Sequence, residues 1–295
     1  MSGIAHAAPP RSRLQARLDQ FRLGTGRLAR RPAAMGGLTV LLLLAAVCAA
    51  APLLPLADPA AIDLPHRLAA PSSAHWLGTD GLGRDVLSRL VWGGRVTLGL
   101  VAAVTLAVAP VGLLVGCIAG YAGGLADMLL MRVTDIFLAF PRLILALAFV
   151  AALRPGVTSA AIAIALTAWP PYARIARADA LALRGAEHVQ AVRLMGAGAG
   201  RIVLRHVLPL CLPAIVVRTS LDMSGIILTA AGLGFLGMGA QPPLPEWGAM
   251  IATARDHLLD HWWLPAIPGA AIFVAALAFN LLGDGLRDAL DPRQT

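Results

Sequence analysis

Long apolar segments alternate with short polar ones along most of the chain, and their lengths suit membrane-spanning helices. A helix needs about 20 predominantly apolar residues to cross the hydrocarbon core of a bilayer. The segments are bounded by prolines, glycines or charged residues, which are common helix boundaries. The pattern predicts an all-α polytopic membrane protein with about six transmembrane helices, at residues 36–56, 96–121, 129–153, 158–183, 210–236 and 265–282.

Composition supports this assignment. Hydrophobic residues make up 58% of the chain and charged residues only 14%, whereas soluble domains carry about 25% charged residues. The net charge is +8, yet every basic residue is an arginine, and the arginines cluster at the ends of apolar segments. A nucleic-acid-binding protein would instead present a basic stripe on a soluble face, so nucleic acid is excluded as a partner.

The distribution of the arginines predicts the orientation. The N-terminal tail, the region 177–205 and the C-terminus hold 14 arginines, and the opposite loops hold six. Since cytoplasmic loops carry an excess of Lys and Arg, both termini and the 177–205 region are predicted to be cytosolic.

The stretch 187–213, EHVQAVRLMGAGAGRIVLRHVLPLCLP, is too charged for hydrocarbon and predicts a water-facing loop between two spans. Residues 187–195 have helix-forming composition, the glycines at 196, 198 and 200 predict a turn, and 201–207 resumes a helical pattern. Gly196 is the expected site of a positive φ. Pro209 and Pro213 are expected to mark the bend back into the membrane. Two short helices joined by a glycine turn would form a rigid, charged projection suited to docking into another protein.

The polar segment 57–93 ends in HWLGTDGLGRDVLSRLVW (75–92), which predicts a loop passing into an amphipathic helix. Asp85 and Arg89 are expected to form an i,i+4 pair. His75, Asp80 and Asp85 are candidate metal ligands, but their spacing matches no common site and Arg84 lies among them. The sequence favours a structural network over a ligand set.

Few residues are candidates for catalysis. The chain has no lysine, so it cannot build the G-x-x-x-x-G-K-[ST] loop that binds nucleotide phosphates. It has no H-E-x-x-H or G-x-S-x-G motif. Cys48, Cys117 and Cys211 lie in or beside apolar segments and are interpreted as buried free thiols. No catalytic residue, metal site or cofactor is predicted, and ATP hydrolysis would require another polypeptide.

Arg218 and Asp222 form an i,i+4 pair in the middle of the fifth segment. An ionisable residue in a membrane span is by default a functional-site candidate. Two interpretations stay open: a polar patch on the translocation pathway, or a self-neutralising pair at a subunit interface. The small-residue run 230–239, AAGLGFLGMG, permits close helix approach and suits a pore wall or a dimer seam.

The charged loop resembles the E-x-x-x-A…G…I-x-x-x-H-x-L-P loop of ABC importer permeases, through Glu187, Ala191, Gly196, Ile202, His206, Leu208 and Pro209. Three further stretches resemble the dipeptide, oligopeptide and nickel branch and its C-type subunit: HWLGTDGLGRD (75–85), FLGMGAQPPLPEWGAM (235–250) and AFNLLGDGLRDALDPR (278–293). The resemblance implies a type I ABC importer permease fold, in which the loop is a coupling helix that fits a cleft in the ATPase subunit.

The resemblance also implies partners: a second homologous permease, two ATP-binding subunits and an extracytoplasmic solute-binding protein, assembled in the bacterial inner membrane. The implied function is ATP-driven import of di- or oligopeptides, with nickel or another small solute as the alternative. Ala230 and Ala231 stand where many peptide permeases carry an acidic residue, which leaves this choice open. An ion-driven secondary transporter is an alternative of another class, but such proteins usually show internal repeats, and none is visible.

These inferences divide the chain into five parts. They are a basic cytosolic tail (1–33), a first transmembrane helix (34–56), a periplasmic loop with an amphipathic helix (57–93), a permease core (94–286) that contains the coupling loop (187–209), and a cytosolic C-terminus (287–295).

Overall fold

The computed structural model describes residues 26 and 28–290, so most of the predicted basic tail and the last five residues lie outside the described residues. Within this part the chain forms helices, turns and loops, with one isolated bridge between Thr79 and Asp85. The predicted all-α membrane fold is confirmed. The elements are α2 (Pro32–Ala49), η1 (Ala51–Leu53), η2 (Leu64–His66), α3 (Val86–Ala122), α4 (Gly124–Leu138), α5 (Arg142–Leu153), α6 (Val157–Ala168), α7 (Pro170–Arg184), α8 (Glu187–Leu194), α9 (Ala199–Ile202), η3 (Val203–Val207), α10 (Leu208–Phe235), α11 (Trp247–Ala254), η4 (Arg255–His257) and α12 (Trp263–Leu290).

Among the described residues, four continuous helical segments are long and apolar enough to cross a membrane, and one bent pair would make a fifth. The four are α2, α3, the segment that joins α9, η3 and α10, and α12; the bent pair is α4 with α5. The remaining predicted segment corresponds to α6 and α7, which are interrupted at Trp169, directly before two prolines. The described residues thus hold four or five of the about six predicted spans, and the third and fourth predicted segments are not continuous helices.

The third segment turns sharply in its middle. α4 and α5 meet at an angle of 92°, and the break falls at residues 139–141, just before α5 begins. Pro141 has no N–H to donate, and it disfavours the helical conformation in the residue before it. The turn carries α5 against α10, since a Cβ atom on Gly232 of α10 would lie 3.4 Å from Cδ1 of Leu143.

The sequence predicts that the helix after the glycine turn ends near Pro209, but in the structure the helix continues past this residue. α9, η3 and α10 form one helical segment of 37 residues, Ala199–Phe235. Its Val203–Val207 turn is π-helical and lies just before Pro209, where it accommodates a residue that lacks an N–H. Pro213 lies inside α10. The expected bend at Pro209 and Pro213 is wrong, and the charged loop continues directly into a membrane span.

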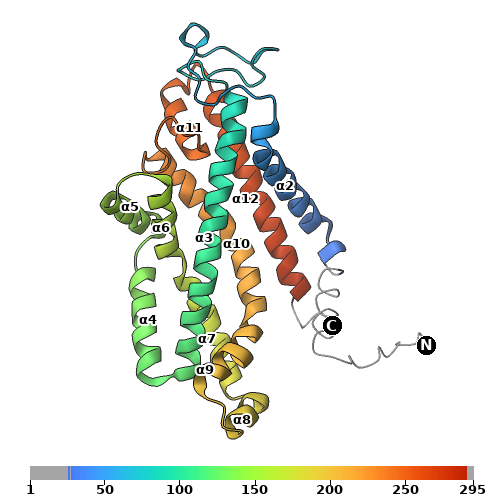
Figure 1. Cartoon of the computed structure of the whole chain (residues 1–295), viewed down its shortest axis with the longest axis vertical. Helices are drawn as coiled ribbons and strands as arrows, with labels where there is room; N and C mark the ends of the chain where they lie inside the picture. Colours follow the sequence, from blue (N-terminus) through green and yellow to red (C-terminus); the bar gives the residue numbers. More distant parts are fainter. Residues whose placement is uncertain (1–25, 27, 291–295) are drawn as a thin grey trace, which may run out of the picture.

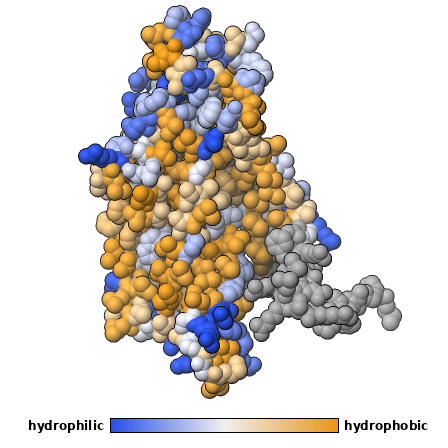
Figure 2. All heavy atoms as spheres, in the orientation of Figure 1, coloured by the Kyte–Doolittle hydropathy of each residue, from blue (hydrophilic) through white to orange (hydrophobic). Residues whose placement is uncertain are grey.

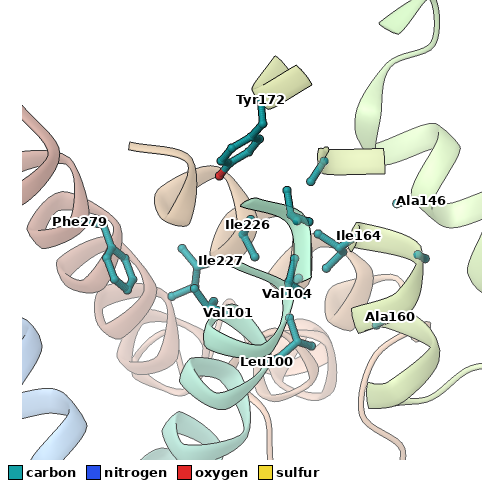
Figure 3. Packing of buried hydrophobic residues seen from close by; sticks show 14 of the residues in the cluster. Leu100, Val101, Val104, Ala146, Ala160, Ile164, Tyr172, Ile226, Ile227 and Phe279 are labelled. Carbon is teal, nitrogen blue, oxygen red and sulfur yellow. The ribbon is translucent and has the colours of Figure 1, made fainter. Parts of the chain in front are cut away.

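The elements are arranged with polar structure at both ends of an apolar body (Figures 1 and 2). The loop before α3 lies with α11 at one end, and α8 and α9 lie at the other (Figure 1). Arg31, just before α2, forms an ion pair of 3.0 Å with Asp288 near the end of α12. Figure 3 shows the apolar cluster where α3, α6 and α10 meet, formed by Leu100, Val101, Val104, Ile164, Ile226 and Ile227.

Among the described residues, the most extensive contact between two helices joins α3 and α7, and it is built from small residues. Gly112, Gly116 and Gly120 recur every four residues along α3, where they face Ala173, Ala176 and Ala180 of α7. A Cβ atom on Gly116 would lie 2.6 Å from the Cβ of Ala176. Helices pack this closely in membranes through small residues, because lipid provides no hydrophobic drive for their association.

We predict that Gly116→Leu lowers the amount of folded protein in the membrane several-fold. The added side chain would overlap the backbone of α7, and overpacking of this kind typically costs about 1–3 kcal/mol or more. Gly99→Leu is the matched control, because Gly99 lies on the same helix and a Cβ there has no atom within 4 Å. Detergent-resistant, monodisperse protein in equal yield from both variants would contradict the prediction.

Candidate functional site

The candidate coupling loop is a short helix closed by a glycine. Glu187 lies in the first turn of α8, where a carboxylate interacts favourably with the helix dipole. At the other end, the N–H of Gly196 donates to the carbonyl of Arg193 at 3.0 Å, and the N–H of Ala197 donates to the carbonyl of Val192 at 3.3 Å. This is the Schellman motif, which satisfies helix-end carbonyls. Gly196 has a φ of +83°, so the predicted positive φ is confirmed.

Buried side chains hold this loop against the body of the molecule. Val189 of α8 and Ile202 of α9 are each only 1% exposed. The Gln190 side-chain amide donates to the carbonyl of Arg184 at 2.9 Å, which ties α8 to the end of α7. A loop anchored on both sides in this way can transmit a displacement to the helices that it joins.

The predicted coupling residues separate into two groups. Glu187, Ala191 and Gly196 lie on the exposed surface of the loop. Ile202 is buried, and His206 and Pro209 are half-buried in η3 and at the start of α10. The first group is available to a partner, and the second connects the loop to the span.

The turn at the end of α8 exposes two apolar residues that the sequence pattern did not single out. Leu194 and Met195 are 88% and 78% exposed, beside the glycine turn. Large apolar side chains clustered on a polar end of the molecule indicate an interaction surface. Two large apolar residues within a segment predicted to face water could have indicated this surface from the sequence.

A cluster of charges joins three helices inside the membrane body. Arg142 of α5 donates through Nη1 to Oδ1 of Asp222 at 3.1 Å, and Arg218 donates through Nη2 to the same oxygen at 3.5 Å. The Tyr172 hydroxyl of α7 donates to Oδ2 at 3.3 Å. The sequence predicted only Arg218 with Asp222, and the nearer arginine comes from 80 residues away. Two arginines share one carboxylate, so this membrane cluster carries a net charge of +1.

Arg218 is the member of this cluster that lines a groove between α7, α10 and α12. The groove has a volume of about 780 Å³ and reaches from Arg218 towards the end of α7 and the start of α10. Its charged lining residues are Asp179, Arg218 and Arg287, and the rest of its lining is apolar apart from backbone atoms: Ile175, Ala182, Leu183, Leu210, Pro213, Ala214, Val217, Leu221 and Leu290. Its volume lies within the range of small-molecule sites, and the groove is open to the surface of the chain.

At the other end of the molecule, charged residues brace the start of α3. Asp80 pairs with Arg84 at 2.7 Å and with Arg89 at 3.4 Å. Asp85 instead caps α3 by accepting from the N–H of Ser88, and it pairs with His75 at 2.9 Å. The expected Asp85–Arg89 pair is wrong, because the cap turns the Asp85 carboxylate towards the helix N-terminus. The interpretation as a structural network is confirmed.

Glu246, at the end of the loop before α11, has a buried carboxylate. Its side chain is 3% exposed and accepts from the N–H groups of Gly248 and Ala249, both at 2.9 Å. The Thr97 hydroxyl of α3 donates to it at 3.2 Å. Burial raises the pKa of the Glu246 carboxyl, and these three hydrogen bonds oppose that rise. The residue joins α11 to α3 at the end of the molecule opposite α8 and α9 (Figure 1).

The small-residue run before this loop packs within the chain. A Cβ atom on Gly248 of α11 would lie 2.7 Å from the Cα of Ala231, and one on Gly234 would lie 3.0 Å from the Ala249 nitrogen. These small residues therefore allow α11 to pack closely against α10. The expectation of a pore wall or dimer seam is wrong for Ala231 and Gly234. The three cysteines are buried and unpaired, as predicted.

Comparison with known families identifies the type of protein. Residues 112–295 match the family described as "Binding-protein-dependent transport system inner membrane component". The chain belongs to this family. Residues 20–71 of this inner-membrane component also match the N-terminal transmembrane domain of oligopeptide transport permease C.

Two curated relatives of this inner-membrane component show the range of cargo within the family. It is 48% identical over 237 residues to the probable D,D-dipeptide transport system permease protein DdpC of Escherichia coli (strain K12), covering 80% of this chain and 79% of that one. It is 46% identical over 239 residues to the nickel transport system permease protein NikC of the same strain, covering 80% and 85%.

The fold also matches a solved structure. An inward-facing MetNI methionine ABC transporter aligns with a TM-score of 0.57 at 20% identity, covering 69% of this chain and 96% of that one. The identity is low, so this match establishes the fold alone: a type I ABC importer permease.

Proposed function

We propose that this inner-membrane component is the permease subunit of an ATP-driven importer that moves short peptides delivered by an external solute-binding protein. The observation that carries the cargo class is the 48% identity to a D,D-dipeptide permease. Nickel is the second candidate, supported by the 46% identity to a nickel permease. The positively charged membrane cluster favours the peptide, because a surplus arginine attracts a carboxylate and repels a divalent cation.

Reconstitution tests this proposal. The chain is placed in proteoliposomes with its second permease, ATP-binding subunits and binding protein, and uptake of labelled D-Ala-D-Ala or ⁶³Ni²⁺ is measured with and without ATP. We expect ATP-dependent dipeptide uptake and no nickel uptake. ATP-dependent uptake of nickel alone would overturn the peptide assignment, and ATP-independent uptake driven by an ion gradient would overturn the transport class.

The proposed role of the coupling loop is to dock into an ATP-binding subunit on the cytosolic side. Glu187, Ala191 and Gly196 form the docking surface with Leu194 and Met195. Ile202, His206 and Pro209 transmit the motion to α10, since this segment is one continuous helix. The chain has no lysine, and we place ATP hydrolysis on two separate subunits. Arg218 and Asp222 are proposed to lie on the translocation pathway, which a second homologous permease completes.

We predict that Gly196→Val lowers coupled uptake by about an order of magnitude while membrane insertion is kept. A Cβ at Gly196 meets no atom within 4 Å, so the effect comes only from its positive φ, which costs a β-branched residue about 1 kcal/mol or more. Gly198→Val is the matched control, because Gly198 is equally open but has an ordinary φ of −67°. Equal uptake by the two variants would show that the turn geometry has no role in coupling.

The proposed orientation places both termini and the coupling loop in the cytosol, with the polar loops 57–93 and 237–260 outside. We predict that a cysteine replacing Gly198 reacts with a membrane-impermeant maleimide only from the cytosolic side, and one replacing Leu259 only from outside. The native cysteines are buried, so they give little background. The reverse labelling pattern would show that the proposed orientation is inverted. The tail 1–33 and the end 287–295 would then lie outside.

A further inference from the structure

Within the described part of the chain, the membrane cluster has one more positive charge than negative charges. Arg142 and Arg218 share the single carboxylate of Asp222. The Nε and Nη2 atoms of Arg142 and the Nε atom of Arg218 are enclosed, and they donate to no atom of the described residues. An arginine cannot shed its proton in a protein, so the surplus charge persists in a membrane environment where an unpaired charge is costly.

Two arginines of the neighbouring helix α7 are neutralised within the chain. Arg174 and Arg177 of α7 each have a carboxylate of their own on α4, at 2.7 Å from Asp135 and 2.6 Å from Asp127. Arg218 makes only one bond to Asp222, at 3.5 Å, and part of its side chain is exposed to the groove. Arg218 is therefore the member of the cluster that is free to take an anion.

The groove that Arg218 lines has charges of both signs. Asp179 of α7 lies in the same groove and has no ion pair or hydrogen bond within the described residues. The remaining lining is largely apolar. A free peptide combines a carboxylate, an ammonium group and apolar side chains, whereas an inorganic anion offers nothing to an apolar wall or to Asp179.

We propose that this groove binds the C-terminal carboxylate of the translocated peptide through Arg218, with Arg142 and Asp222 holding the guanidinium in place. Arginine matches a carboxylate with two parallel N–H···O bonds. The site recognises a group common to all free peptides, so it sets the chemical class of the cargo and leaves side-chain selection to the binding protein. The inference rests on the proposed peptide import and adds a site within the permease.

The test measures binding to the purified permease–ATPase complex without the binding protein. The probes are Ala-Ala and its C-terminal amide, which differ only in the carboxylate. We expect the amide to bind about ten- to a hundredfold more weakly, as the loss of a charge-assisted hydrogen bond predicts. Arg218→Gln should weaken Ala-Ala by the same factor and leave the amide unchanged. This variant keeps the neutral Arg142–Asp222 pair, so the chain is expected to fold.

Arg174→Gln is the control, since it removes an arginine of α7 that lies outside the groove; it should bind both probes as the unaltered complex does. The absence of Ala-Ala binding, or equal affinity for acid and amide, would overturn the inference. Equal weakening of both probes by Arg218→Gln would assign Arg218 to a carboxylate of the second permease instead. In these cases ATP-driven peptide uptake by the full system would still stand, so failure of the proposed function is measured separately.

Discussion

Replacing the apolar tip of the coupling loop with charge is expected to abolish ATP-driven uptake while the protein remains folded. Leu194 and Met195 are 88% and 78% exposed, so Leu194→Asp with Met195→Asp disturbs no packing within the chain. Burying a large apolar side chain at an interface contributes about 1.5–3 kcal/mol. Losing two of them corresponds to a weakening of ATPase docking by about a hundredfold or more.

The measurement is co-purification of the ATP-binding subunits and uptake in vesicles at matched membrane expression. Leu259→Asp is the control, because Leu259 is 94% exposed in the polar loop at the opposite end of the molecule. It makes one of the two changes, Leu to Asp, at the end of the molecule opposite the proposed docking surface. Normal uptake by the double variant would show that the tip is not a docking surface.

The second large effect is expected from Asp222→Ala, which removes the carboxylate shared by Arg142 and Arg218. Two unpaired arginines then remain in the membrane body, and an uncompensated buried charge costs about 3–5 kcal/mol. This is a large share of the stability of a protein, so we expect the variant to be degraded or to aggregate. Membrane yield and size-exclusion profile are the measurements.

Asp135→Ala is the control for this effect. Asp135 also pairs with an arginine, Arg174, but the two side chains are 51% and 56% exposed, and exposed pairs contribute about 0–1 kcal/mol. We expect the Asp135 variant to accumulate normally. In addition, Arg218→Gln combined with Asp222→Asn should recover part of the lost yield, since it halves the unpaired charge. Equal yields from the two alanine variants would contradict the assignment of Asp222 as the neutralising group.

The sequence predicted the features that depend on length, composition and local backbone preference. The apolar segments were found because a span needs a fixed number of apolar residues, whatever the tertiary structure. The positive φ of Gly196 followed from its place between a helical stretch and a glycine-rich turn, and the structure has it at +83°. The buried Ile202 and the exposed Glu187 both lie within the loop that the motif outlined.

The features that depend on contacts between distant residues were not predictable. Arg142 reaches Asp222 across 80 residues, and only the 92° turn at Pro141 brings it there. The prolines at 209 and 213 are ordinary signs of a helix boundary, yet a π-helical turn keeps the segment continuous. The glycine stripe at 112, 116 and 120 is visible in the sequence, but its partner on α7 is fixed only by the fold.

The docking of the coupling loop on an ATP-binding subunit is the central claim, and cross-linking tests it most directly. A photoreactive amino acid placed at Met195 in the assembled transporter is irradiated, and the cross-linked products are identified by mass spectrometry, with the same probe at Leu259 as reference. We predict that Met195 cross-links to an ATP-binding subunit and that Leu259 does not. A cross-link from Leu259 but not from Met195 to the ATP-binding subunit, or none from Met195 in an assembly that hydrolyses ATP, would contradict the account.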